Sequence, residues 1–146
     1  MMPRFVAIDY GQKRTGLAVG DDITGLVQPY EVLSVAHGEP LYAALTKAID
    51  EIGPDAIVVG LPLNMDGSEG PAAKAARDFG AVIAERTRLP VDYQDERLSS
   101  FSAETQLAGT GRTRKEKREL RDALAAAEIL REYLADRGAV PFDDPD

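Results

Sequence analysis

Hydrophobic residues in the first third of the chain fall in three short runs that are rich in β-branched and aromatic side chains. These runs predict strands over Arg4–Asp9, Thr15–Asp21 and Leu26–Val35. The connection between the first two runs is short and contains Gly11, which favours a hairpin and hence an antiparallel meander. Pro29 indicates either an irregular start of the third strand or a position at an edge of the sheet, because proline cannot donate a hydrogen bond to a neighbouring strand.

The middle of the chain alternates between helical and strand patterns. Apolar residues recur at helical spacing over Pro40–Gly53, and Pro71–Thr87 is predicted as a second helix. Between them, Asp55–Pro62 is a short apolar run that is typical of a central strand covered on both faces. Pro90–Glu96 has the alternating character of a further strand.

The last part of the chain is predominantly helical. A serine-capped short helix is expected over Ser99–Ala108, followed by a flexible link over Gly109–Thr113. Thr113 and Glu116 have the spacing of a capping box, which predicts that a long helix begins there and ends before Gly138. Residues 1–138 therefore form one domain, and residues 139–146 form an acidic tail.

The order β-β-β-α-β-α-β-α predicts an α/β fold. Three antiparallel strands followed by two strands that helices separate give a mixed five-stranded sheet flanked by helices. Ligands of such sheets bind at the carboxyl ends of the strands. Asp9, the Gly60–Gly67 loop and the pair Asp95-Glu96 all lie at predicted strand ends.

Composition excludes several classes of protein. The 146 residues include no cysteine, so neither disulfides nor thiolate metal sites are expected. No apolar run approaches the roughly 20 residues that span a bilayer, and the N-terminus has no signal-peptide pattern. We therefore expect a cytoplasmic protein without membrane contact. The net charge of −8 argues against a uniformly basic surface, although it does not describe how the charges are distributed.

Candidate chemistry rests on carboxylates from separate elements. Asp9 closes the first strand, where an ordinary turn residue is the alternative interpretation. At the end of the last strand the sequence alone does not choose between Asp95 and Glu96, and a solvated charge paired with Arg97 is the alternative for Glu96.

Asp122 is the most informative of these carboxylates. It lies inside the last predicted helix, on the same stripe as Ala126, Ile129 and Tyr133. Aspartate is unfavourable in a helix interior, and a buried unpaired carboxylate is costly. The alternative is a solvent-facing Asp122 paired with Arg118 one turn earlier.

Carboxylates that converge repel one another unless a cation lies between them. One or two Mg²⁺ or Mn²⁺ ions, which prefer oxygen ligands, remove that conflict. Two such ions can hold the attacking and leaving oxygens of a phosphodiester and supply a water nucleophile. Convergence of Asp9, Asp122 and either Asp95 or Glu96 would therefore indicate nuclease chemistry.

Basic residues gather immediately before Asp122. The ten residues from Arg112 to Arg121 contain six basic and two acidic side chains, which suits phosphate binding, although a solvated helix face is the alternative. Further candidates come from the first hairpin and from the loop after the central strand, whereas His37 is taken as a solvated turn residue without a role. The candidate nucleic-acid contacts are Lys13, Arg14, Asn64, Arg112, Arg114, Lys115, Lys117 and Arg118.

Four motifs resemble the YqgF family of bacterial proteins, in order and over nearly the whole chain: "AIDYGQKRTGLAVGD", "VVGLPLNMDGSEG", "DERLSS" and "RDALAAAEILREYL". The family's members are described as Holliday junction resolvases or pre-16S rRNA nucleases. The resemblance implies a ribonuclease H-like fold and metal-dependent hydrolysis of phosphodiesters. By position it assigns the catalytic and metal-binding roles to Asp9, Glu96 and Asp122, which favours Glu96 over Asp95.

The function expected from this resemblance is a metal-dependent nuclease acting on structured nucleic acid, either precursor 16S rRNA or a four-way DNA junction. A junction resolvase that makes paired cuts is expected to act as a homodimer. One alternative is a non-catalytic nucleic-acid-binding module of ribosome assembly. Another is a phosphotransferase, because the first hairpin also resembles the phosphate-binding hairpin of the actin and sugar-kinase superfamily, although those proteins need two lobes.

Overall fold

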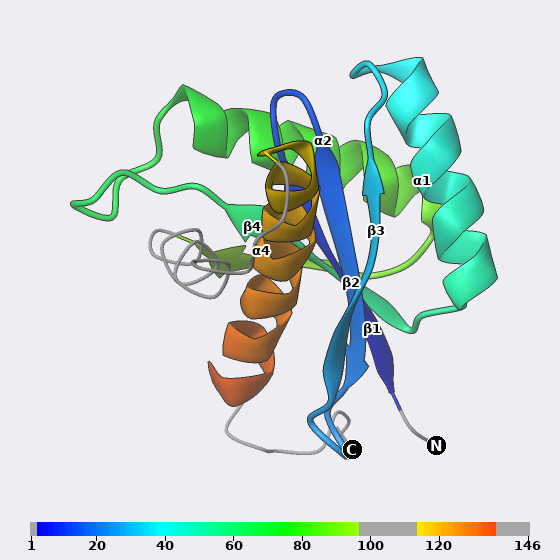
Figure 1. Ribbon diagram of the computed structural model, residues 1–146. Coiled ribbons are helices and arrows are strands. Elements are labelled where there is room, and N and C mark those ends of the chain that lie inside the picture. Colours follow the sequence, from blue (N-terminus) through cyan, green and yellow to red (C-terminus); the bar gives the residue numbers. More distant parts are fainter. Residues whose placement is uncertain (1–2, 97–113, 137–146) are drawn as a thin grey trace.

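A mixed five-stranded sheet forms the centre of the computed structural model, which describes residues 3–96 and 114–136 (Figure 1). The strands lie in the order β3-β2-β1-β4-β5, with β1, β2 and β3 antiparallel and with β4 and β5 parallel to β1. This topology confirms the predicted fold class. The strands are β1 (Arg4–Tyr10), β2 (Thr15–Asp21), β3 (Val27–Leu33), β4 (Ala56–Leu61) and β5 (Val91–Asp95).

Helices cover both faces of the sheet. Helix α4 (Arg114–Asp136) crosses one face, while α1 (Glu39–Ile52) and α2 (Pro71–Thr87) lie on the other (Figure 1). A proline stands in the first turn of α1 and of α2, and Gly53 ends α1 in the left-handed conformation that glycine adopts without strain. No helix of the described ranges is long and apolar enough to cross a membrane.

The two faces of the sheet are packed differently because strand side chains alternate between them. On the side of α1 and α2, large residues form the main core, including Ile8, Leu17, Leu45 and Phe79. On the side of α4, the sheet presents mostly small residues to Ile129 and other side chains of the helix.

This surface of small residues, the α4 seam, lets the helix approach the sheet closely. A Cβ atom at Gly16 would collide with the backbone carbonyl of Asp122, and one at Gly20 would lie 3.2 Å from a methyl group of Leu130. The helix contributes alanines to the same contact. The seam consists of Ala7, Gly16, Ala18, Gly20, Ala56 and Gly60 on the strands and of Ala123, Ala126 and Ala127 on α4.

The predicted elements agree with the structure to within about two residues at most ends. Strand β3 is shorter than predicted and, as Pro29 indicated, lies at the edge, where its pairing with β2 shifts in register between Leu17 and Ala18. On α4, Ala126, Ile129 and Tyr133 of the Asp122 stripe are buried, as are Ala127 and Leu130, while Leu120 and Leu124 are half-buried.

Several predictions fall on segments outside the described residues. These are the short helix over Ser99–Ala108, the link over Gly109–Thr113, the Thr113 cap, the helix end at Gly138 and the tail over 139–146.

The seam predicts a specific cost for added volume. Gly16→Ala is expected to lower the free energy of unfolding by about 1–3 kcal/mol, because the new methyl group meets backbone that cannot move aside cheaply. Gly70→Ala is the matched control, since a Cβ there lies 3.4 Å from the Asn64 side chain, an ordinary contact. Urea unfolding of both variants checks this, and equal stability of the two would contradict the seam.

Candidate functional site

Three carboxylates from different elements meet at the carboxyl ends of β1 and β5. Asp9 alternates with Phe5 and Ala7 along β1, so its side chain faces α4. Gly16 pairs with Asp9 across the hairpin and also touches the backbone of Asp122. The seam therefore brings the Asp122 turn of α4 over the end of β1, close enough that the charge of Asp122 acts on Asp9.

Glu96 completes the group from the end of β5. Its backbone N–H donates to the carbonyl of Leu61, 3.2 Å away, which continues the β4–β5 pairing by one residue. Its side chain shares a hydrogen bond with Asp9 and fills the space that a Cβ at Gly60 would need, 2.6 Å from Glu96 Oε1. Of the two carboxylates between which the sequence did not choose, Glu96 is therefore the one beside Asp9.

The proximity of these carboxylates changes their ionisation. Burial raises the pKa of Asp9 to about 6, to which the charge of Asp122 adds, while the hydrogen bond from Glu96 works in the opposite direction. Burial, followed by the charge of Asp9, raises the pKa of Glu96 to about 9. Glu96 is thus the protonated partner near neutral pH, and its O–H donates to the Asp9 carboxylate.

Asp122 has a different partner. Arg14, which follows the turn after β1, donates from Nε to Asp122 Oδ2, and both side chains are half-buried. The alternative interpretation, a pairing with Arg118, does not hold: the counter-ion of Asp122 comes from the first hairpin rather than from its own helix. Arg14 was singled out in the sequence as a phosphate contact, but here it neutralises a carboxylate of the site.

The arrangement bears on the predicted metal site. Within residues 3–96 and 114–136, no three or more histidine or acidic side chains stand together as a ready set of metal ligands. Asp9 and Glu96 contact each other through a proton, and Asp122 contacts Arg14. The donor chemistry nevertheless fits a divalent cation, because the oxygens are carboxylates whose mutual repulsion only a positive charge or a proton relieves.

The loop that follows β4 is held by its own hydrogen bonds. Asn64 Nδ2 donates to Ser68 Oγ at 3.0 Å, and the N–H of Gly67 donates to the carbonyl of Asn64 at 2.8 Å. Gly67 has a φ of 88°, which the turn requires. Asn64 is exposed, but one of its amide hydrogens is used within the turn.

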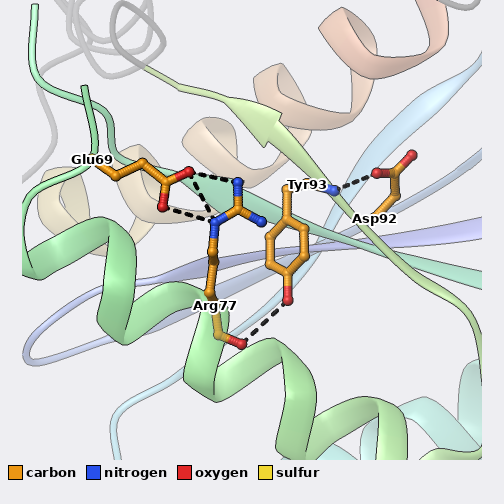
Figure 2. A network of polar contacts seen from close by, with 4 residues as sticks. All are labelled: Glu69, Arg77, Asp92 and Tyr93. Atoms are coloured by element: carbon orange, nitrogen blue, oxygen red, sulfur yellow. Dashed lines mark hydrogen bonds and ion pairs between the residues drawn. The ribbon is translucent and has the colours of Figure 1, made fainter. Parts of the chain in front are cut away.

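A second contact fixes the end of this loop against β5 (Figure 2). The guanidinium of Arg77 on α2 binds both carboxylate oxygens of Glu69, at 2.6 to 3.0 Å, and lies over the ring of Tyr93, 4.9 Å from its centroid. The hydroxyl of Tyr93 donates to the carbonyl of Arg77 and packs against Gly80. The loop is therefore anchored beside β5, the strand that Glu96 follows.

The remaining predicted phosphate contacts differ in exposure. Arg114 and Arg118 on the first turns of α4 and Lys13 on the hairpin next to Arg14 are exposed, whereas Lys117 is half-buried. Figure 1 places the start of α4 and the tip of the β1–β2 hairpin at the same end of the molecule. Arg112 and the side chain of Lys115 lie outside what the structure describes.

His37 lies in a turn at the surface, as the sequence indicated, but it also makes specific contacts that the sequence did not predict. Its ring is exposed but stacks on Tyr10, with centroids 4.5 Å apart. Nε2 lies 2.7 Å from the carbonyl oxygen of Gly11 and therefore donates to it, while Nδ1 is 3.1 Å from the Tyr10 hydroxyl. His37 thus ties the segment before α1 to the hairpin that carries Arg14.

Two features of the site were missed by sequence reasoning. Gly16 and Gly60 permit the close approach of Asp122 and Glu96, and glycines inside strands are a recognisable signal of such an approach. The ion pair between Arg14 and Asp122 joins residues 108 positions apart, and no pattern along the chain indicates it.

Comparison with solved structures places this fold among the ribonuclease H-like resolvases. Thermus thermophilus RuvC, solved in complex with a Holliday junction substrate, superposes with a TM-score of 0.58, covering 95% of this chain and 98% of that one at 18% identity. The fowlpox virus resolvase, solved with Holliday junction DNA, gives a TM-score of 0.56 at 11% identity, covering 94% and 99% of the two chains. Likeness at this level of identity concerns the fold.

Sequence comparison defines the family. The model of the RuvX family, described as Holliday junction resolvase, matches residues 3–136, and the chain belongs to this family. A protein of Anaeromyxobacter sp. named "Putative pre-16S rRNA nuclease" is 42% identical over 136 residues, covering 93% of this chain and 99% of the relative. A protein of the same name from Geobacillus thermodenitrificans is 41% identical over 133 residues, covering 90% and 96%. The resemblance to YqgF proteins is thereby confirmed.

The raised pKa values predict how stability depends on pH. Both groups bind protons more tightly in the folded than in the unfolded chain, so their contribution is most favourable below about pH 4. It is lost as pH rises through about 6 and towards 9. In EDTA, the free energy of unfolding is therefore expected to fall more steeply over this range in the wild type than in Glu96→Gln, whose amide donates to Asp9 without titrating.

Urea unfolding at several pH values measures both slopes. Glu69→Gln is a suitable control, because the Arg77 hydrogen bond lowers the pKa of the exposed Glu69, whose titration therefore lies below this range. Parallel slopes for the wild type and Glu96→Gln would contradict the shared proton.

Proposed function

We propose that this protein is a divalent-metal-dependent nuclease that hydrolyses phosphodiester bonds in structured nucleic acid. The observation that carries the proposal is the convergence of Asp9, Glu96 and Asp122 from two strand ends and one helix. Such a group of half-buried carboxylates is unfavourable for stability, which supports a role in catalysis. Membership of the RuvX family and the names of the relatives support the same activity.

The three carboxylates would hold one or two Mg²⁺ or Mn²⁺ ions through their oxygens. Bound ions of this kind activate water and neutralise charge on the attacked phosphate. To hold such an ion, Glu96 would have to give up the proton that it shares with Asp9, and Asp122 would have to leave Arg14.

Phosphates of the substrate would be held by the basic side chains around this site. Arg114, Lys117 and Arg118 precede Asp122 on α4, while Lys13 lies on the hairpin beside it. Because the protein carries a net charge of −8, these cations direct the phosphate backbone to one end of the molecule.

The substrate that we favour is the precursor of 16S rRNA. Two relatives that match this chain over almost their whole length, at 42% and 41% identity, are named pre-16S rRNA nucleases. Processing of ribosomal RNA would place the protein in the cytoplasm. A four-way DNA junction is the second candidate, supported by the description of the family model. Paired cuts in a junction would require a homodimer.

Loss of one carboxylate is expected to abolish cleavage. Changes around a metal site that leave its ligands intact cost about 10–100-fold, so Asp9→Asn, Glu96→Gln and Asp122→Asn are each expected to reduce the rate by at least about 100-fold. The rate is measured with Mn²⁺ or Mg²⁺ on precursor 16S rRNA, a four-way DNA junction and linear duplex DNA.

Asp50→Asn is the matched control, because Asp50 is exposed on α1, on the opposite face of the sheet. Equal cleavage by the wild type and all three site variants would show a contaminating nuclease. Binding without cleavage under all conditions would favour the non-catalytic assembly module, and hydrolysis of ATP alone would favour the phosphotransferase.

The basic end of α4 makes a separate prediction. Arg114→Glu and Lys117→Glu are each expected to weaken nucleic-acid binding and to reduce the slope of log Kd against log salt by about 1. Lys47→Glu, the same change on the exposed face of α1, is expected to leave that slope unchanged. Fluorescence anisotropy at several salt concentrations measures the effect, and similar slopes for all three variants would contradict the assignment.

A further inference from the structure

Arg14 occupies the carboxylate that a metal ion would need. Its Nε donates to Asp122 Oδ2, so that one side of the Asp122 carboxylate is taken by a guanidinium. A cation bound to Asp9, Glu96 and Asp122 together would compete with this ion pair, because both draw on the same carboxylate charge.

The backbone makes this contact a fixed feature of the fold. Thr15, the residue after Arg14, is buried and opens β2, and Gly16 then meets the carbonyl of Asp122. The turn before Arg14 is tight, because Gly11 approaches the carbonyl of Arg14 too closely for any Cβ. His37 holds the carbonyl of Gly11 from outside the hairpin. The base of the Arg14 side chain is thus positioned from both sides.

The tip of the same side chain is available to a second anion. Within residues 3–96 and 114–136, Arg14 bonds through Nε alone, and its two terminal nitrogens donate to none of these residues. The side chain retains 23% of its exposure. A planar guanidinium can bind two oxygens of a phosphate with two nitrogens at once, which is a stronger match than a single bond to a carboxylate.

We propose that Arg14 is a positioning residue that holds Asp122 until a substrate phosphate takes its guanidinium, so that nucleic acid and the divalent ion bind cooperatively. This inference rests on the proposed function and adds an order of assembly to it. Without substrate, the ion pair weakens metal binding. With a phosphate on Arg14, Asp122 is free to join Asp9 and Glu96. By linkage, the metal strengthens nucleic-acid binding by the same factor.

The first test measures Mn²⁺ binding to the full chain by isothermal titration calorimetry in the absence of nucleic acid. Arg14→Gln is expected to bind Mn²⁺ at least about fivefold more tightly than the wild type, the lower end of typical coupling between sites. Lys13→Gln is the matched control, because it removes one positive charge from the exposed neighbour of Arg14. It is expected to change the Mn²⁺ affinity much less. Arg14→Lys keeps the charge and is expected to stay near the wild type.

A double variant identifies the carboxylate concerned. In an Asp122→Asn background, Arg14→Gln is expected to give no gain in Mn²⁺ affinity, because the carboxylate for which Arg14 and Mn²⁺ compete is absent. Circular dichroism and urea unfolding establish that each variant is folded. Equal or weaker Mn²⁺ binding by Arg14→Gln, or a gain that persists without Asp122, overturns the inference.

The second test measures cooperativity by fluorescence anisotropy with a labelled four-way DNA junction and a labelled RNA hairpin, each in Ca²⁺ and in EDTA. The Kd in EDTA divided by the Kd in Ca²⁺ measures how much the metal strengthens binding. This ratio is expected to be at least about fivefold larger for the wild type than for Arg14→Gln. Equal ratios overturn the inference but leave the nuclease intact. If the wild type binds neither Mn²⁺ nor either probe, the proposed function fails, and the inference fails with it.

Discussion

The close approach of α4 to the sheet is the constraint on which the site depends. Gly16 and Gly60 have no Cβ atoms that would hold α4 away from the sheet. The backbone of Asp122 therefore contacts β2, and Ile129 contacts β4. The same two glycines flank Asp9, one on each neighbouring strand. Packing therefore does more than stabilise the fold, since the missing side chains are what allow carboxylates from separate elements to meet.

That meeting has an electrostatic consequence. Asp9 and Glu96 share a proton because burial raises the pKa of both groups, and Asp122 is neutralised by Arg14. The site thus reaches a balance of charge with the groups of its own chain. A divalent cation that bound here would have to displace a proton and rearrange an ion pair, so its binding would be coupled to pH and to the position of the first hairpin.

Local patterns were sufficient to predict most of the fold, because its elements differ in period and are bounded by glycine or proline. Pro71 and Gly53, for example, mark helix ends that the structure reproduces. The sequence also singled out Asp9 and Asp122, since a charged residue on a strand end or on an apolar helix stripe breaks the pattern, whereas Glu96 was preferred to Asp95 only through the family resemblance. What could not be predicted is pairing across the chain. The partner of Asp122 proved to be Arg14 and not Arg118, because the seam determines which hairpin residue lies beside the helix.

The hairpin between β1 and β2 therefore serves two purposes at once. Its first strand carries Asp9 towards α4, and the alternation that does so sends Tyr10 to the opposite face, where its ring stacks on Phe79 at 4.0 Å and on His37 at 4.5 Å. This stack fixes the end of β1 from the side of α2, while the seam fixes it from the side of α4. A carboxylate held from both faces cannot move away from its neighbours, so the repulsion within the site has to be relieved by protons, by Arg14 or by a bound cation.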